Sequence, residues 1–150
     1  MKGVDKPGKV GTPRLERMSL LKAVLQSFRI RQDEELQPHG ITTSQLRMLW
    51  TVEANPAVSG AQVARMCSVT PQTGQATLAA MEAHGWIRRR ASEKSDRVLV
   101  AELTAKGRKV LMVGKEIAER LDREVWDGIA EWELAGMEAA LGAAVERLER

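Results

Sequence analysis

The segment from Ser59 to Leu103 constrains the fold of this chain most strongly, because two short helical patterns, a tight connection and a hairpin pattern follow one another directly. Ser59 opens the first helical pattern, and Gln62 follows at the spacing of a capping box. Thr70 and Pro71 open the second pattern, since threonine caps helices and proline suits the first helical position. We therefore predict two helices joined by a tight turn and followed by a β-hairpin.

The predicted hairpin is densely basic. Residues 86–90 and 97–103 have the composition of strands, and the polar residues 91–96 between them predict a turn. Residues 86–109 carry eight basic and three acidic side chains, a net charge of +5, whereas the whole chain carries only +3. Because side chains alternate along a strand, Arg88 and Arg90 should share one face and Arg89 the other. Such a patch attracts a polyanion, although basic hairpins also occur as solvated edges that prevent strand pairing.

Helical patterns flank this segment on both sides. Hydrophobic residues recur at three- and four-residue spacing over residues 15–28 and 129–148, and these stripes need a partner, either a second chain or the chain's own core. The fold class that we predict is mainly α with a small β-hairpin wing, that is, a winged helix-turn-helix. The predicted divisions are a flexible basic tail at 1–13, an N-terminal dimerisation helix at 14–40, a winged helix-turn-helix DNA-binding module at 41–103 and C-terminal dimerisation helices at 104–150.

The second helix of such a module enters the major groove of DNA, where its N-terminal half reaches the base edges. Glutamine pairs with adenine edges, and threonine offers a hydroxyl group and a methyl group. The candidate readout residues are Thr70, Gln72, Thr73, Gln75 and Thr77. The candidate wing contacts are Arg88, Arg90, Lys94 and Arg97. We expect Lys94 and Arg97, near the tip, to reach the adjacent minor groove or its phosphates.

The run from Ile41 to Gly107 resembles the MarR family of bacterial regulators. The residues that carry the resemblance are ITTSQLRMLW at 41–50, SGAQVARMCSVTPQTGQATLAAMEAHGWIRRR at 59–90 and AELTAKGR at 101–108. The resemblance implies a homodimer in which the first and last helices intertwine and two winged modules bind a pseudo-palindromic operator in double-stranded DNA. It also implies release of DNA by a small aromatic or lipophilic effector. We therefore expect a ligand-responsive transcriptional repressor.

The chain departs from the family pattern in the wing and in the second helix. Arg97 takes the arginine position of the wing motif, but Ser92 and Ser95 stand where acidic residues are usual. Ala76 replaces a common basic residue, and Gly74 interrupts the helix at a cost of up to about 1 kcal/mol. These departures favour an alternative, a winged-helix protein-interaction or dimerisation module with little DNA affinity. A different winged-helix family with a helical dimerisation end is a further alternative. The arginine cluster favours DNA binding.

Few other residues suggest chemistry. Met48, Trp50 and Trp86 are candidates for an effector pocket, although tryptophan and methionine at helical spacing usually belong to a core. Cys67 is interpreted as a buried small hydrophobe in preference to a redox switch. One cysteine and two distant histidines predict no metal site, and no phosphate loop or nucleophile motif predicts an enzyme or a cofactor. The chain lacks an apolar run of about 18–20 residues and an apolar signal core, so we expect a cytoplasmic protein without membrane spans.

Overall fold

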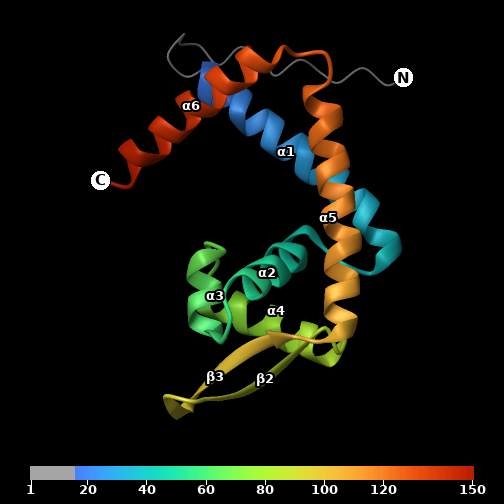
Figure 1. Cartoon of the computed structure of the whole chain (residues 1–150), viewed down its shortest axis with the longest axis vertical. Coiled ribbons are helices and arrows are strands. Elements are labelled where there is room, and N and C mark those ends of the chain that lie inside the picture. The colour runs from blue at the N-terminus through green and yellow to red at the C-terminus, as the bar shows by residue number, and fades with distance from the viewer. Residues whose placement is uncertain (1–15) are drawn as a thin grey trace. The chain divides into compact units, whose positions relative to one another are not determined.

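The computed structural model describes residues 16–150, so the predicted tail at 1–13 lies outside the described residues. These residues form α-helices, one short 3₁₀ helix and one small antiparallel sheet (Figure 1). The elements are α1 (Glu16–Leu36), the 3₁₀ helix η1 (Gln37–His39), α2 (Thr43–Ala54), β1 (Val58–Ser59), α3 (Gly60–Met66), α4 (Pro71–Ala83), β2 (Ile87–Ser92), β3 (Ser95–Leu103), α5 (Ala105–Trp126) and α6 (Glu131–Leu148). The predicted winged helix-turn-helix class is confirmed. The chain forms two compact units, one ending at Ala118 and the other running from Glu119 to Arg150.

The predicted helix starts are confirmed by their side-chain caps. At α3, Gln62 N donates to Ser59 Oγ at 3.3 Å, and Ser59 N donates to Gln62 Oε1 at 2.9 Å, which completes a capping box. At α4, Thr73 N donates to the Thr70 hydroxyl at 3.2 Å, and Pro71 occupies the first helical position. These caps fix where each helix of the helix-turn-helix begins.

Gly74 and Gly107 allow two close approaches that a side chain would block. A Cβ atom on Gly74 would lie 2.7 Å from Ala64 Cβ, so the glycine lets α4 pack closely against α3. A Cβ atom on Gly107 would lie 1.9 Å from the carbonyl oxygen of Trp86, where α5 starts beside the base of the hairpin. Gly74 therefore has a packing role besides interrupting the helix.

The sheet has the strand order β1–β3–β2, and both pairings are antiparallel. Two features differ from the sequence prediction. The turn of the hairpin comprises only residues 93–94, because β2 continues to Ser92 and β3 starts at Ser95. The polar composition of residues 91–96 suggested a longer turn, but polar residues tolerate strand geometry where the hairpin projects into solvent. The two-residue strand β1 was not predicted, since two residues are too few to form a pattern.

The hydrophobic core of the first unit lies among the helix-turn-helix, the base of the sheet and the first part of α5. Its largest fully buried side chains are Leu36, Met48, Leu49, Val63, Leu78, Met81, Ile87 and Leu111. Outside this core, exposed apolar side chains are most numerous on α1 and α6. Leu25 of α1 is 68% exposed, and Trp132 and Leu148 of α6 are 76% and 85% exposed. Within residues 16–150, these apolar side chains are exposed to solvent.

Among the helices of residues 16–150, none combines the length and the apolar composition that a membrane crossing requires.

Candidate nucleic-acid interface

Helix α4 presents an exposed polar N-terminal half. Gly74, Leu78 and Met81 are buried against the module, so the opposite side of the helix faces solvent. Of the predicted readout residues, four are exposed, namely Thr70, Gln72, Thr73 and Gln75. Ala76 and Ala79 are exposed as well, and the sequence analysis did not include them among the readout candidates.

The three threonines of this region make local hydrogen bonds. The Thr70 hydroxyl donates to Thr73 Oγ1 at 3.0 Å while it accepts from Thr73 N. Thr77 is half-buried, and its hydroxyl donates to the Thr73 carbonyl oxygen at 2.8 Å. Thr77 therefore lies on the flank of α4, whereas Thr70 and Thr73 lie at its open N-terminal end.

Gln75 is exposed, but its carboxamide contacts neighbouring elements of the protein. Its Oε1 accepts a long hydrogen bond of 3.4 Å from Arg89 Nη1, and its Nε2 lies 3.0 Å from the position that a Cβ atom on Gly60 would take. The carboxamide thus lies between the hairpin and the start of α3, although sequence reasoning assigned it to readout. The signal that could have revealed this is the arginine of β2 on the side of the sheet that faces α4.

On the opposite face of the hairpin, Glu102 binds two arginines. Arg88 Nη2 lies 3.0 Å from Glu102 Oε2, and Arg90 Nη2 lies 2.7 Å from Glu102 Oε1. The strand register explains this arrangement, because Arg88 and Glu102 are cross-strand partners and Arg90 follows on the same face. Hydrogen bonds from Arg90 and then Arg88 hold the pKa of the Glu102 carboxyl below its usual value.

Arg89 projects from the other face, as the alternation of side chains predicted. Its Nη2 lies 2.6 Å from Oε2 of Glu82, which is on α4. The hydrogen bond from Arg89 is the largest influence that lowers the pKa of Glu82. The wing arginines are therefore divided between two faces, and each face contains an acidic partner. Sequence reasoning missed Glu82 and Glu102 because neither partner is adjacent to its arginine in the chain.

The tip of the hairpin carries the cations without acidic partners. Lys94 and Arg97 are exposed, and within residues 16–150 neither side chain forms an ion pair. Their backbone N–H groups donate to Ser92 Oγ at 3.2 Å and to Ser95 Oγ at 3.4 Å. The two serines, which stand where acidic residues are usual in the resemblance, thus accept backbone hydrogen bonds at the turn. Glu93 and Asp96 are exposed beside them, so residues 93–97 carry two acidic and two basic side chains, and the cationic groups of Lys94 and Arg97 are accessible to an external anion.

The three residues predicted for an effector pocket lie in different surroundings. Met48 and Trp86 belong to the core, at 0% and 4% exposure, and Trp86 stacks on His84 with ring centroids 4.6 Å apart. Trp50 is exposed on α2, with Lys115 Nζ 5.3 Å from its ring centroid. All three side chains are thus committed to internal packing or to a surface cation–π contact.

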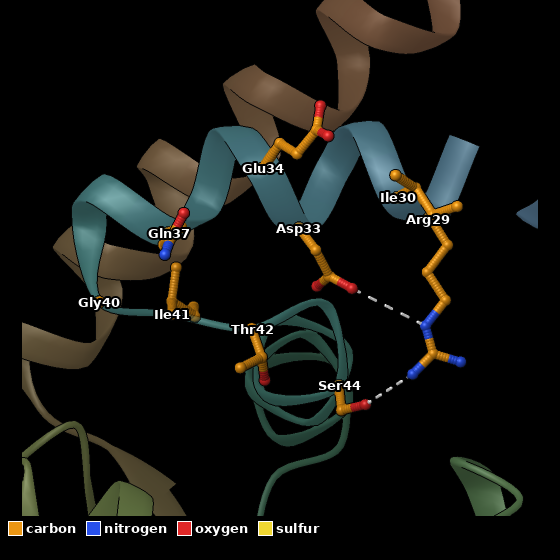
Figure 2. A pocket seen from close by; sticks show the side chains of 9 residues that line it. All are labelled: Arg29, Ile30, Asp33, Glu34, Gln37, Gly40, Ile41, Thr42 and Ser44. Carbon is orange, nitrogen blue, oxygen red and sulfur yellow. Dashed lines mark hydrogen bonds and ion pairs between the residues drawn. The ribbon is translucent and has the colours of Figure 1, made fainter. Parts of the chain in front are cut away.

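A pocket of about 710 Å³ lies instead between the end of α1 and the start of α2 (Figure 2). Arg29 on its wall lies 4.0 Å from Asp33 and donates a 3.5 Å hydrogen bond to Ser44. Burial raises the pKa of Asp33, but hydrogen bonds from Thr43 and the charge of Arg29 lower the pKa further, so that it lies below its usual value. Ile30 and Ile41 supply apolar surface to the same pocket.

Two remaining sequence interpretations concern metals and Cys67. In the part of the chain that the structure describes, no group of three or more His, Cys, Asp or Glu side chains is positioned to hold a metal ion. Cys67 is buried as expected, with its Sγ 3.4 Å from the Thr51 hydroxyl.

Comparison with known proteins identifies sequence relatives. The model of the MarR family matches residues 39–97. The HTH-type transcriptional repressors Rv2887 of Mycobacterium tuberculosis and Mb2911 of Mycobacterium bovis are each 36% identical to this chain over 90 residues. The alignment covers 60% of this chain and 65% of each repressor, slightly less than two thirds of their length.

Solved structures share the fold at low sequence identity. The MepR–DNA complex of S. aureus aligns over 91% of this chain and 99% of its own, with a TM-score of 0.80 and 19% identity. CouR from Rhodococcus jostii RHA1, bound to p-coumaroyl-CoA, aligns over 86% of this chain and 91% of its own, with a TM-score of 0.76 and 18% identity.

Proposed function

We propose that this chain, whose residues 39–97 match the model of the MarR family, is a member of that family and a transcriptional repressor that binds double-stranded DNA. The observation that carries the proposal is the pairing of two exposed features. The open N-terminal half of α4 is uncharged, and the hairpin that follows it ends in two exposed cations, Lys94 and Arg97, that form no ion pair within residues 16–150. The first suits base readout and the second suits phosphate binding. We assign the protein to regulators rather than enzymes, and to the cytoplasm, where bacterial regulators meet their DNA.

In this proposal the module at 41–103 contacts DNA through α4 and the wing. Thr70, Gln72 and Thr73 lie in the major groove, and Lys94 and Arg97 reach the adjacent minor groove or its phosphates. Arg88 and Arg90 contribute less than the tip cations, because each must first leave Glu102. Gln75 and Thr77 contribute through the shape of the helix more than through direct contact.

The proposal includes a homodimer that binds a pseudo-palindromic operator. The exposed apolar stripes of α1 and α6 are stabilised when another apolar surface buries them. A second copy of the chain supplies an identical pair of stripes. This assignment gives the segments 14–40 and 104–150 their role in dimerisation. Two copies of the module then match the symmetry of the operator.

We also propose that the pocket between α1 and α2 binds a small aromatic or lipophilic effector that carries an acidic group. Its volume of about 710 Å³ suits a ligand of drug size. The long contacts of Arg29 to Asp33 and Ser44 are weak, so an anionic ligand can replace them. The pocket joins the proposed dimerisation helix to the DNA-binding module, so occupation there would alter the spacing of the two modules. The CouR neighbour, bound to p-coumaroyl-CoA, supports this class of ligand.

A gel-shift titration tests the proposed function. The chain is mixed with DNA from upstream of its own gene and with a shuffled sequence of the same composition, at low and raised salt. We expect preferential binding of the upstream DNA that weakens with salt, and a weaker, flatter salt response after neutral substitution of Lys94 and Arg97. A chain that forms dimers but shifts neither DNA would favour the alternative of a protein-interaction module.

A further inference from the structure

Arg89 is more enclosed than its neighbours in the hairpin. Its side chain is 22% exposed, compared with 72% for Arg88 and 40% for Arg90. Its Nε donates to Glu82 Oε2 at 2.8 Å, and its backbone N donates to Glu82 Oε1 at 3.2 Å. A cation that binds DNA phosphates needs an accessible guanidinium group, and Arg89 lacks this accessibility.

The guanidinium group of Arg89 joins two turns of α4. While Nε and Nη2 hold Glu82, Nη1 reaches Gln75, which lies two helical turns closer to the N-terminus of the helix. The planar fork of arginine makes this possible, since its N–H groups point in several fixed directions. A single residue of β2 therefore fixes both the position of the hairpin along α4 and the orientation of the Gln75 carboxamide.

We propose that Arg89 is a positioning residue for DNA recognition, which holds α4 and the wing as one unit and keeps Gln75 away from the bases. The inference rests on the proposed function, and it names which side chains of that interface read sequence. A glutamine that forms a bidentate hydrogen-bonded pair with adenine uses both the oxygen and the nitrogen of its carboxamide. Both glutamines are exposed, but Gln75 has its Oε1 bound by Arg89 and its Nε2 against α3, so Gln72 is the glutamine that remains for readout.

Three variants separate positioning from phosphate contact. Arg89→Lys keeps the positive charge beside Glu82 but lacks the fork that reaches Gln75. Arg89→Met removes the charge and keeps an unbranched apolar stem. Arg97→Met removes a tip cation that we assign to phosphate contact, and it serves as the matched comparison. Each variant is titrated with the operator and with shuffled DNA over a range of salt concentrations, and its thermal unfolding is followed by circular dichroism.

For Arg89→Lys we expect unfolding close to that of the unsubstituted chain and an unchanged salt slope. The ratio of operator affinity to shuffled-DNA affinity should fall by about tenfold. This is comparable to the loss of affinity that one mismatched base pair in an operator causes. Adding Gln75→Ala to this variant should cause no further loss, because the two residues act through one contact. Arg97→Met should instead reduce the salt slope by about 0.9.

The inference is overturned if Arg89→Lys discriminates between the two DNAs as well as the unsubstituted chain, or if Arg89→Met reduces the salt slope by about 0.9, as loss of a phosphate contact would. Gln75→Ala alone provides a second measurement if the Arg89 variants unfold. In a folded protein it should lower discrimination as much as Arg89→Lys does, without a loss confined to one base pair of the operator. A loss confined to one base pair would show that Gln75 reads that base and would overturn the inference. Failure of the unsubstituted chain to bind any DNA would refute the proposed function, and this inference with it. If only this inference is wrong, the unsubstituted chain still binds the operator.

Discussion

At the residue scale, the charge of the hairpin is partly neutralised within the chain. Arg88 and Arg90 share Glu102, and Arg89 binds Glu82, whereas Lys94 and Arg97 have no acidic partner in residues 16–150. The sequence could predict the alternation of the three arginines, because strand geometry fixes it. It could not predict the acidic partners, since these depend on a strand register and a helix contact that bring distant residues together.

Replacing Glu102 tests whether this internal neutralisation limits DNA binding. Glu102→Gln leaves the shape of the side chain nearly unchanged and releases Arg88 and Arg90. If both arginines then bind phosphates, the salt slope of DNA binding should increase by up to about 1.8, and affinity at low salt should rise. The measurement is a titration of labelled DNA at several salt concentrations. Weaker binding after this substitution would show that the Glu102 pairs order the wing for DNA binding.

The pH dependence of stability follows from the lowered pKa values of Asp33, Glu82 and Glu102. A carboxyl group whose pKa is lower in the folded state than in the unfolded state stabilises the fold. This stabilisation is complete at pH values above the unfolded pKa, which is about 4. That stabilisation is lost as the pH falls through the lowered folded value. We therefore expect the melting temperature to decline below about pH 4–5, and Glu102→Gln to reduce the decline. An identical pH profile for the variant would contradict the contribution of Glu102.

At the scale of elements, the helix-turn-helix was predictable because its starts are local. Capping residues and a proline mark α3 and α4 within a few positions of each helix start. The hairpin was predicted with too long a turn, and β1 was missed, because neither the turn nor a two-residue strand has a strong local pattern. The importance of Gly74 was also not predictable, since it depends on the distance between two helices.

Gly74→Ala tests the close packing of α3 against α4. Alanine gains up to about 1 kcal/mol of helix propensity, but the new methyl group would overlap Ala64, and overpacking typically costs about 1–3 kcal/mol. We expect a net loss of stability, measured by urea unfolding. Adding Ala64→Gly should restore part of the packing, so the double variant should lose less than the two single losses combined. A Gly74→Ala protein more stable than the unsubstituted chain would refute the packing role.

At the scale of the whole molecule, the proposed dimer explains why two helices expose apolar stripes. Leu25→Glu and Leu148→Glu place charges at side chains that are 68% and 85% exposed, so the single chain should tolerate them. We expect these variants to sediment as monomers and to bind the operator far more weakly. Met66→Glu is the matched control, because Met66 is 50% exposed on α3, outside the proposed dimer helices, and this variant should remain dimeric. If Leu25→Glu and Leu148→Glu each remained dimeric, the contact between subunits would have to lie elsewhere.

Groove-specific cleavage of DNA tests the central claim most directly, namely that α4 and the hairpin tip meet one face of a double helix. An iron chelate that generates hydroxyl radicals is attached to Gln72→Cys or to Arg97→Cys in a Cys67→Ala background, and the cut positions on operator DNA are mapped. We predict major-groove cleavage from position 72 and minor-groove cleavage from position 97, centred about 5 base pairs apart, half a helical turn. Cleavage from only one position, or from both at unrelated sites, would contradict the account.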